Sequence, residues 1–190
     1  MFINRKTEIT ELDEIFAKKT NQLVIVFGRR RVGKSFLLKH YCSQKKIRHI
    51  YFIGTKSTCQ VQLARFLELC AGVLEQPQLS QVTVSTWLDA FHLIAPFLKK
   101  EKTVITFDEF PWIMEKSPEV ETEIHNFWET QKSKDDGSFN LVLCGSQLSM
   151  MKQIMGENRP LYGRKTAHIQ LAPFTPAQAQ AFNEGFGLKD

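Results

Sequence analysis

The sequence predicts an α/β fold, in which a mainly parallel sheet is covered by helices on both faces. Apolar runs with the length of buried strands alternate along the chain with segments whose apolar residues recur at helical spacing. A glycine-rich loop also stands between the first of these strands and the helix that follows it. With 190 residues, of which 43% are hydrophobic, the chain is long enough to build a packed core.

The predicted elements follow one another in a regular order. A first helix is expected over Ile9–Phe16, with Thr7 as its cap, and Pro96 is expected to kink or end a later helix. Ser117 and Pro118 are a typical helix start. The strands are expected at residues 22–28, 47–53, 103–110, 139–146 and 168–174. The remaining helices are expected at residues 35–42, 63–70, 86–98 and 117–128.

The segment GRRRVGKS fits the phosphate-binding pattern G-x-x-x-x-G-K-[ST] in full. Gly28 and Gly33 allow backbone conformations that a Cβ atom would forbid, so that the loop N–H groups can surround an anion. Lys34 is expected to reach the β- and γ-phosphates, and the Ser35 hydroxyl to be one Mg²⁺ ligand. The predicted nucleotide-binding residues of this segment are Gly28, Arg29, Arg30, Arg31, Val32, Gly33, Lys34, Ser35 and Phe36.

Two acidic residues lie at the C-terminal end of the third predicted strand, VITFDEF. Ligands of parallel sheets bind at the carboxyl ends of the strands, so Asp108 is expected beside the phosphate loop as a second metal ligand. Glu109 is expected to polarise an attacking water. This second acid favours ATP hydrolysis, and the base-reading motif [NT]-K-x-D of GTPases does not occur in the sequence.

Two further polar residues are candidates for the reaction. Ser146 follows the fourth strand and could sense the γ-phosphate or hold the water. Arg164, in the segment RPLYGRKT, is a candidate arginine finger that would neutralise charge in the transition state. The sequence leaves open whether Arg164 would act in its own chain or in a neighbouring one.

Basic residues are concentrated in one part of the chain. The formal net charge is +5, but the segment from Ile15 to Leu67 contains twelve Lys and Arg residues and no Asp or Glu. A block of one sign attracts polyanions, either the phosphates of a nucleotide or a nucleic acid. We expect at least one of Arg29, Arg30 and Arg31 to pair with an acidic residue of the chain or with a phosphate.

Several classes of protein are disfavoured by the sequence. No apolar run approaches the roughly 18 residues of a membrane span, and the polar N-terminus lacks the apolar region of a signal peptide, which favours a cytoplasmic protein. The four cysteines form no C-x-x-C pair and the histidines form no zinc-binding pattern. Cys70 and Cys144 are expected to be buried thiols.

Taken in order, the segments FINRKTEITELDEIF, VIVFGRRRVGKSFLLKHY, VITFDEFPWI, LVLCGS and PLYGRKTAHIQLAPF resemble the archaeal-type AAA-like P-loop ATPases. This family occurs in archaea and bacteria and is related to the signal-transducing P-loop ATPases. The resemblance implies a three-layer P-loop NTPase sandwich with a five-stranded sheet of order 5-1-4-3-2. It also implies ATP and Mg²⁺ as ligands, Asp108 and Glu109 as the acid pair, and Asn4 and Arg5 near the adenine.

The resemblance also predicts the domain organisation. Residues 1–174 would form the ATPase core, and residues 175–190 the start of a helical lid that continues beyond Asp190. Thr175 and Gln178 have the spacing of a capping box at the start of that lid. Family members often carry a winged-helix or nuclease-like domain after the lid, through which DNA could be bound.

The leading hypothesis is a Mg²⁺-dependent ATPase that acts as a switch or motor for an attached domain. The alternatives are a nucleotide-gated nucleic-acid-binding module, a small-molecule kinase and a nucleotide-binding scaffold that hydrolyses little. The sequence leaves the oligomeric state open. Within the loop, Arg29 occupies a variable position, so its side chain is expected to matter less for ATP binding than that of Lys34.

Overall fold

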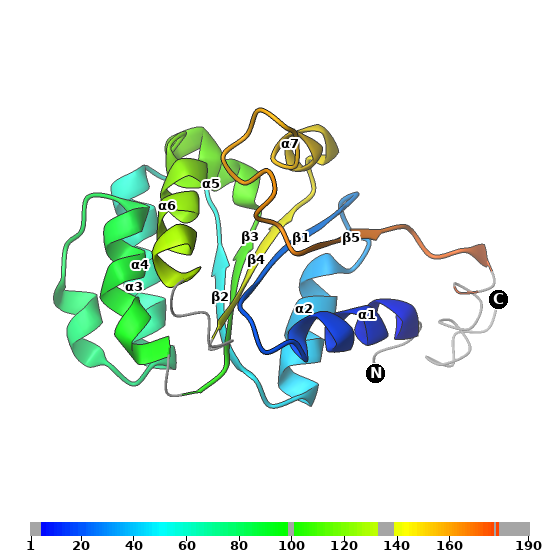
Figure 1. Cartoon of the computed structure of the whole chain (residues 1–190), viewed down its shortest axis with the longest axis horizontal. Helices are drawn as coiled ribbons and strands as arrows, with labels where there is room; N and C mark the ends of the chain where they lie inside the picture. Colours follow the sequence, from blue (N-terminus) through cyan, green and yellow to red (C-terminus); the bar gives the residue numbers. More distant parts are fainter. Residues whose placement is uncertain (1–4, 99–100, 133–138, 177, 179–190) are drawn as a thin grey trace.

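The structure is a computed structural model, and it describes residues 5–98, 101–132, 139–176 and 178. Five parallel strands form one sheet in the order β2-β3-β4-β1-β5 (Figure 1). This is the predicted order 5-1-4-3-2 read from the opposite edge, so the predicted fold is confirmed. The strands are β1 (Gln22–Gly28), β2 (Arg48–Ile53), β3 (Thr103–Asp108), β4 (Phe139–Gly145) and β5 (Ala167–Leu171).

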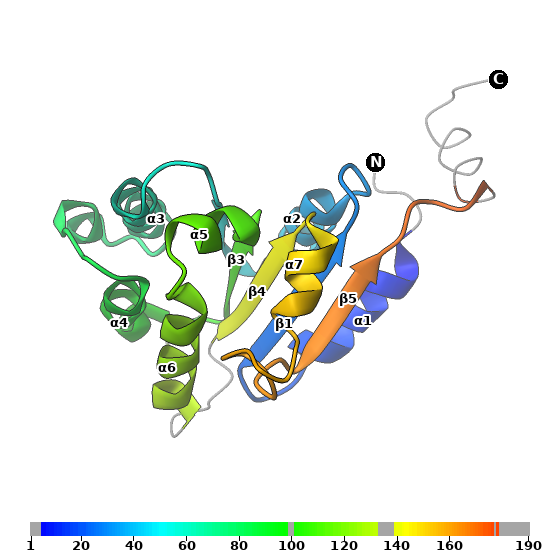
Figure 2. The same cartoon turned by 90° about the horizontal axis from the view of Figure 1, so that it is seen from above.

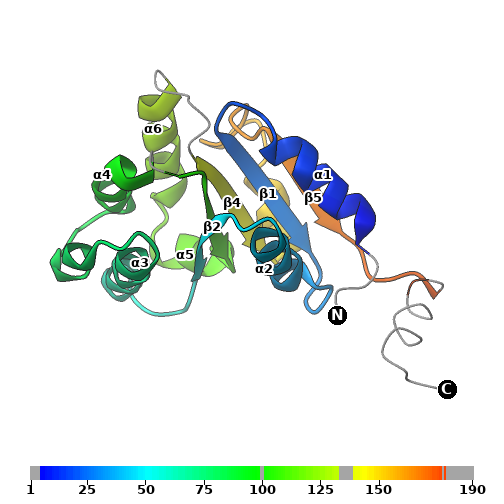
Figure 3. The ribbon, with the colours of Figure 1, turned by 90° about the horizontal axis from the view of Figure 1, so that it is seen from below.

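Helices cover both faces of the sheet and complete a three-layer sandwich (Figures 2 and 3). One face carries α1 (Lys6–Phe16) and α2 (Lys34–Gln44). The other face carries α3 (Cys59–Val73), α4 (Trp87–Leu98), α5 (Phe110–Lys116), α6 (Val120–Lys132) and α7 (Leu148–Gln153), with a short 3₁₀ helix, η1 (Pro77–Gln81), between α3 and α4.

The alternation of side chains along each strand divides the core into two clusters. Val24, Val26, Val104 and Val142 face α1 and α2. On the other face, α3 and α4 bury a cluster of tilted and edge-on aromatic rings. Because both faces are buried, the central strands are mostly apolar, which is why they were recognisable in the sequence. The aromatic cluster consists of Phe52, Phe66, Trp87, Phe91 and Phe107.

Three strands end earlier than predicted, the fourth by a single residue, at Gly145. The third stops at Asp108, because Glu109 takes a left-handed conformation with φ 50° and begins the turn into α5. The fifth spans Ala167–Leu171 rather than residues 168–174. Pro173 lies just beyond its end, and proline has no N–H group to extend a strand ladder.

The predicted helix starts were less accurate than the helices themselves. Helix α1 begins at Lys6, so Thr7 lies inside the helix and does not cap it. Helix α6 begins at Val120, and the Ser117 hydroxyl instead accepts a hydrogen bond from the indole of Trp87 at 3.2 Å. Helix α4 continues two residues past Pro96.

The four cysteines are free thiols, and Cys70 and Cys144 are buried as predicted. Within the described residues, no helix combines the length and the apolar character needed to cross a membrane. Thr175 and Gln178 exchange the two hydrogen bonds of a capping box, at 2.9 and 3.3 Å. Most of the lid predicted at residues 175–190 lies outside the described residues.

Candidate functional site

The phosphate loop connects the carboxyl end of β1 to the amino end of α2. Gly33 has φ 93°, in the left-handed region that favours glycine, and Arg31 is also left-handed with φ 65°. Gly28 is required for a different reason: a Cβ atom there would lie 2.3 Å from the carbonyl oxygen of Leu171 at the end of β5. The predicted conformational role therefore holds for Gly33, whereas Gly28 makes room for β5.

The side chain of Lys34 folds back onto the phosphate loop. Its side chain is only 6% exposed, and its ammonium group donates hydrogen bonds to the carbonyl oxygens of Gly28 and Arg29, each at 3.0 Å. The lysine at the start of α2 is thus held over the same loop whose N–H groups would surround an anion. That Lys34 reaches the phosphates of a nucleotide stays a prediction.

Ser35 and Asp108 meet at the centre of the site. The Ser35 hydroxyl donates to Asp108 Oδ2 at 2.6 Å, although 73 residues separate them in the chain. Tyr51 in β2 donates a second hydrogen bond to the same oxygen, and the backbone N–H of Glu109 donates to Oδ1 at 2.9 Å. This pairing of a hydroxyl with a carboxylate is a set of hard oxygen donors that suits Mg²⁺.

The hydrogen bonds also decide the charge of Asp108. Burial alone would raise the pKa of this carboxyl group, but hydrogen bonds from Ser35, Tyr51, Cys144 and the Glu109 backbone together lower the pKa below its ordinary value. Burial and the hydrogen bond to Asp108 both raise the pKa of the Tyr51 phenol. At neutral pH the site therefore holds a carboxylate that accepts and a phenol that donates.

Glu109 and Ser146 form a second pair at the carboxyl edge of the sheet. The strands β3 and β4 are neighbours, so the residues that follow them lie close together. The Ser146 hydroxyl lies 3.1 and 3.3 Å from the two carboxylate oxygens of Glu109, within hydrogen-bond distance of both. A left-handed conformation costs a residue with a side chain roughly 1–2 kcal/mol, and Glu109 adopts it at the start of α5.

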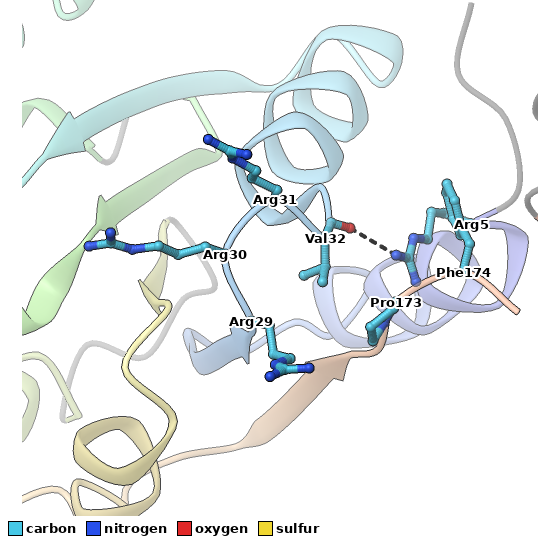
Figure 4. Close-up of a pocket in the computed structure, with 7 residues that line it drawn as sticks. All are labelled: Arg5, Arg29, Arg30, Arg31, Val32, Pro173 and Phe174. Atoms are coloured by element: carbon cyan, nitrogen blue, oxygen red, sulfur yellow. Dashed lines mark hydrogen bonds between the residues drawn. The ribbon is translucent and has the colours of Figure 1, made fainter.

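Two concavities flank the loop, and Arg30 and Arg31 line both of them. The first, of about 460 Å³, also contains Lys34, Ser35 and Glu109, and Gly33 and Phe36 complete its lining. The second, of about 350 Å³, lies on the side of β5 and the N-terminal segment (Figure 4). Its remaining lining residues are Arg5, Arg29, Val32, Pro173 and Phe174.

Arg5 joins the parts of the second concavity. Its guanidinium group donates to the carbonyl oxygens of Val32, at 2.8 Å, and Ala172, at 2.9 Å. The same group lies 4.4 Å from the centroid of the Phe174 ring and pairs with Glu8 at 2.7 Å. The side chain is 5% exposed, so its charge is almost fully enclosed by these partners. Figure 4 shows Arg5 and Phe174 together at one side of the concavity.

A model of an ATPase domain predominantly from Archaea matches residues 2–188. The chain belongs to this family of ATPase domains. The chain is similar to MJECL04, a protein of Methanocaldococcus jannaschii, with 25% identity over 174 residues. That match covers 91% of this ATPase domain and 36% of MJECL04. An ATP-binding protein of the same organism, MJ0423, is 44% identical over 48 residues, covering 25% of this chain and 81% of that protein.

Solved structures share the fold of the ATPase domain at low sequence identity. The ORC2 protein of Aeropyrum pernix, solved with ADPNP and ADP, has a TM-score of 0.71 at 13% identity, covering 98% of this chain and 53% of that one. Cdc6p of Pyrobaculum aerophilum has a TM-score of 0.62 at 16% identity, covering 92% of this chain and 47% of that one. The ATPase domain therefore spans about half the length of these proteins.

Arg164 is not brought to the phosphate loop. The nearby Thr166 pairs with Leu23 at the start of β1, whereas the loop follows Gly28 at the end of β1. Figure 2 shows the segment before β5 at the end of the sheet opposite the strand arrowheads. Arg164 instead forms an ion pair with Glu129, at 2.5 Å, without hydrogen-bond geometry. The structure therefore does not support Arg164 as an arginine finger at the site of its own chain. That Arg164 acts at the site of a neighbouring chain stays a prediction.

Two other residues, Asn4 and Phe36, were predicted to bind the nucleotide. Asn4 lies outside the described residues. Phe36 is 57% exposed at the start of α2, where its ring stacks with that of His40 at a centroid distance of 6.2 Å. In the described part of the chain, Arg29, Arg30 and Arg31 form no ion pair, so the expected pairing with an acidic residue is not found there.

Tyr51 is the site residue that the sequence analysis missed. It lies in a strand that was recognised, and the predicted order already placed that strand beside the one ending in Asp108. Tyr51 is opposite Thr106, two residues before Asp108, so all three face the same side of the sheet. A phenol within an otherwise apolar stretch of strand was the signal that could have identified it.

Proposed function

We propose that this ATPase domain binds ATP with Mg²⁺ and hydrolyses it by an activated water. The observation that carries the proposal is the contact of Ser35 with Asp108 at 2.6 Å, with Glu109 next to it and Lys34 closing the loop. A phosphate-loop hydroxyl, a strand-end carboxylate and a second acid are the parts that phosphoryl transfer to water requires. Membership of the ATPase family supports the same conclusion.

The phosphates would lie in the concavity that contains Lys34, Ser35 and Glu109. The loop N–H groups and the amino end of α2 favour negative charge there, and the Lys34 ammonium adds a positive charge. Ser35 and Asp108 would hold the Mg²⁺ ion, which when bound neutralises charge on the phosphate oxygens. The base and ribose would lie in the second concavity, near Arg5 and Phe174.

Glu109 would act as the base. Its carboxylate accepts a proton from the water that attacks the γ-phosphate, and the Ser146 hydroxyl restricts the orientation of that carboxylate by lying within hydrogen-bond distance of both its oxygens. The left-handed turn at Glu109 directs the chain into α5 and leaves the carboxylate beside Ser146. The metal-binding acid and the base are therefore adjacent in sequence but have different hydrogen-bond partners.

The variant Glu109→Gln tests the proposal. It should bind ATP like the wild type, while hydrolysis falls by a factor of about 10² to 10⁴ because the amide cannot accept the proton. Glu115→Gln is a matched control, since Glu115 lies in α5, the helix that follows Glu109, is half exposed and pairs only with its neighbour Lys116 among the described residues. Equal turnover in Glu109→Gln and the control would refute the assignment of the base.

We further propose that the nucleotide state drives an attached domain as a switch or motor. The match covers 36% of MJECL04, so that protein is much longer than the matched region. The capping box of Thr175 and Gln178 supports a helix that begins the lid at residues 175–190, after a core of residues 1–174. Nucleotide-dependent protection of the segment after Pro173 from proteolysis is expected; equal cleavage with and without ATP would contradict the switch.

A nucleotide-gated nucleic-acid-binding module is the alternative that one observation favours. The side chains of Arg29–Arg31 are exposed and unpaired within the described residues. Other parts of the basic block have acidic partners, because Lys45 pairs with Asp13 at 2.7 Å and Arg48 pairs with Glu101 at 3.9 Å. This alternative would be supported by DNA binding that weakens with salt. The logarithm of the binding constant should fall against the logarithm of the salt concentration with a slope of about 0.9 per phosphate contact.

A small-molecule kinase is the other enzyme that this loop could serve. A kinase would consume ATP only when a phosphoryl acceptor is added. Release of phosphate from ATP in water alone, lost in Glu109→Gln, would favour the ATPase over the kinase.

A further inference from the structure

Asp108 receives a hydrogen bond for which the proposed reaction has no role. Tyr51, in β2, donates its phenolic hydrogen to Asp108 Oδ2, the oxygen that also accepts from Ser35 at 2.6 Å. The backbone N–H of Glu109 donates to the other oxygen at 2.9 Å. These donors come from α2, β2 and the turn into α5, and the Cys144 thiol donates a fourth hydrogen bond, so the carboxylate has little freedom to rotate.

The ring of Tyr51 is itself held in place under the helix that carries Ser35. The ammonium of Lys39, one turn further along α2, lies 4.3 Å from the ring centroid. On the strand, His49 packs edge-on against the same ring at 5.2 Å. These contacts involve the ring and not the hydroxyl, so the two functions of the side chain can be separated by removing the oxygen alone.

We propose that Tyr51 is a positioning residue for the divalent cation that Ser35 and Asp108 would hold. The inference rests on the proposed function, which supplies the cation. Metal-binding carboxylates depend on the groups that orient them, and loss of such an outer partner typically weakens metal binding by about 10- to 100-fold. Without the phenol, Asp108 would have to be ordered at the moment the cation binds, and the cost would appear as weaker binding.

The test compares nucleotide affinity with and without the cation. A fluorescent, non-hydrolysable ATP analogue is titrated onto the chain in excess EDTA and again in excess Mg²⁺. Tyr51→Phe should leave the affinity in EDTA unchanged and lower the affinity in Mg²⁺ by about tenfold. A role confined to supporting the fold would lower both affinities together, so the difference between the two conditions isolates the positioning role.

Tyr41→Phe is the matched control. The Tyr41 hydroxyl also donates to an aspartate, Asp13 Oδ1 at 2.9 Å, and Lys45 lies 5.9 Å from its ring centroid. This pair is formed between α1 and α2, away from Asp108. Tyr41→Phe should therefore behave like the wild type in both conditions, although it removes a tyrosine–aspartate hydrogen bond of the same kind.

Each outcome decides the inference. If the wild type gains affinity from Mg²⁺ and Tyr51→Phe gains as much, Tyr51 has no positioning role while the proposed function stands. If the wild type gains nothing from Mg²⁺, the proposed function fails and the inference fails with it. Should Tyr51→Phe not fold, Tyr51→Met also lacks the hydroxyl and should show the same Mg²⁺-specific loss; an equal loss in EDTA would overturn the proposal.

Discussion

Replacing Gly28 by alanine tests how the phosphate loop is built into the sheet. An added Cβ atom would lie 2.3 Å from the carbonyl oxygen of Leu171 and 3.2 Å from Val32 Cγ2. The first distance is more than an ångström shorter than the roughly 3.5 Å at which non-bonded atoms rest. The obstacle is backbone in the adjacent strand, so either the end of β5 or the start of the loop has to move.

The size of the effect follows from that clash. Inserting one carbon into a tightly packed position costs about 1–3 kcal/mol. For a chain of this length, a loss of about 2 kcal/mol lowers the melting temperature by roughly 4–8 °C. Because the loop begins at Gly28, its movement would also displace the N–H groups from the phosphates, and nucleotide affinity should fall in the same variant.

Gly72→Ala is the same substitution at a position where it should raise the stability of the fold. Gly72 lies in α3, and a Cβ atom there would meet no heavy atom within 4 Å. Alanine is favoured over glycine in a helix by about 0.5–1 kcal/mol, so this variant should melt at a higher temperature and bind nucleotide normally. Thermal unfolding followed by circular dichroism measures the melting temperatures of the two variants. If Gly28→Ala melts with or above the wild type, β5 does not pack against the loop as described.

Three further predictions follow from the site. Ser146→Ala should lower the rate of ATP hydrolysis about tenfold with little change in nucleotide affinity, because it removes only an orienting contact to Glu109; a large loss of affinity would contradict this. Lys34→Ala should weaken ATP binding far more than Arg29→Ala, measured by the same titration, and equal losses would refute the ranking. Burial, with the charge of Lys39, lowers the pKa of His49 to about 4 in the folded chain. Below pH 6.5 the unfolded chain therefore binds more protons than the folded chain, and the free energy of unfolding should fall by on the order of 3 kcal/mol as the pH is lowered from 6.5 to 4. Urea unfolding of His49→Gln over this range should lack that slope.

The strands and the loop were predictable because their signals are local. A run such as LVIVF is apolar throughout, and the G-x-x-x-x-G-K-[ST] spacing identifies the loop without knowledge of the fold. Asp108 was assigned correctly to the end of a strand because parallel sheets bind ligands at that edge. The strand order came from the family resemblance, since apolar patterns alone do not say which strands are neighbours.

Contacts between distant parts of the chain were not predictable in this way. The hydrogen bond from Tyr51 spans 57 residues, and the one from Arg5 to Ala172 spans 167. The predicted helix start at Ser117 failed for a similar reason. A capping pattern is a local preference, and at Ser117 a partner from another helix, Trp87, accounts for the hydroxyl instead.

The backbone at Glu109 explains how two adjacent acids can have separate functions. In an extended strand, consecutive side chains point to opposite faces, so Asp108 faces the layer of α2 and meets Ser35 there. If the strand continued, Glu109 would face the layer of α3 to α6. The left-handed turn ends the strand first, and the Glu109 carboxylate remains at the edge of the sheet beside Ser146. The strained residue is therefore what keeps the predicted base on the same edge as the predicted metal ligands, and its cost of roughly 1–2 kcal/mol is met by the packing of α5 that follows it.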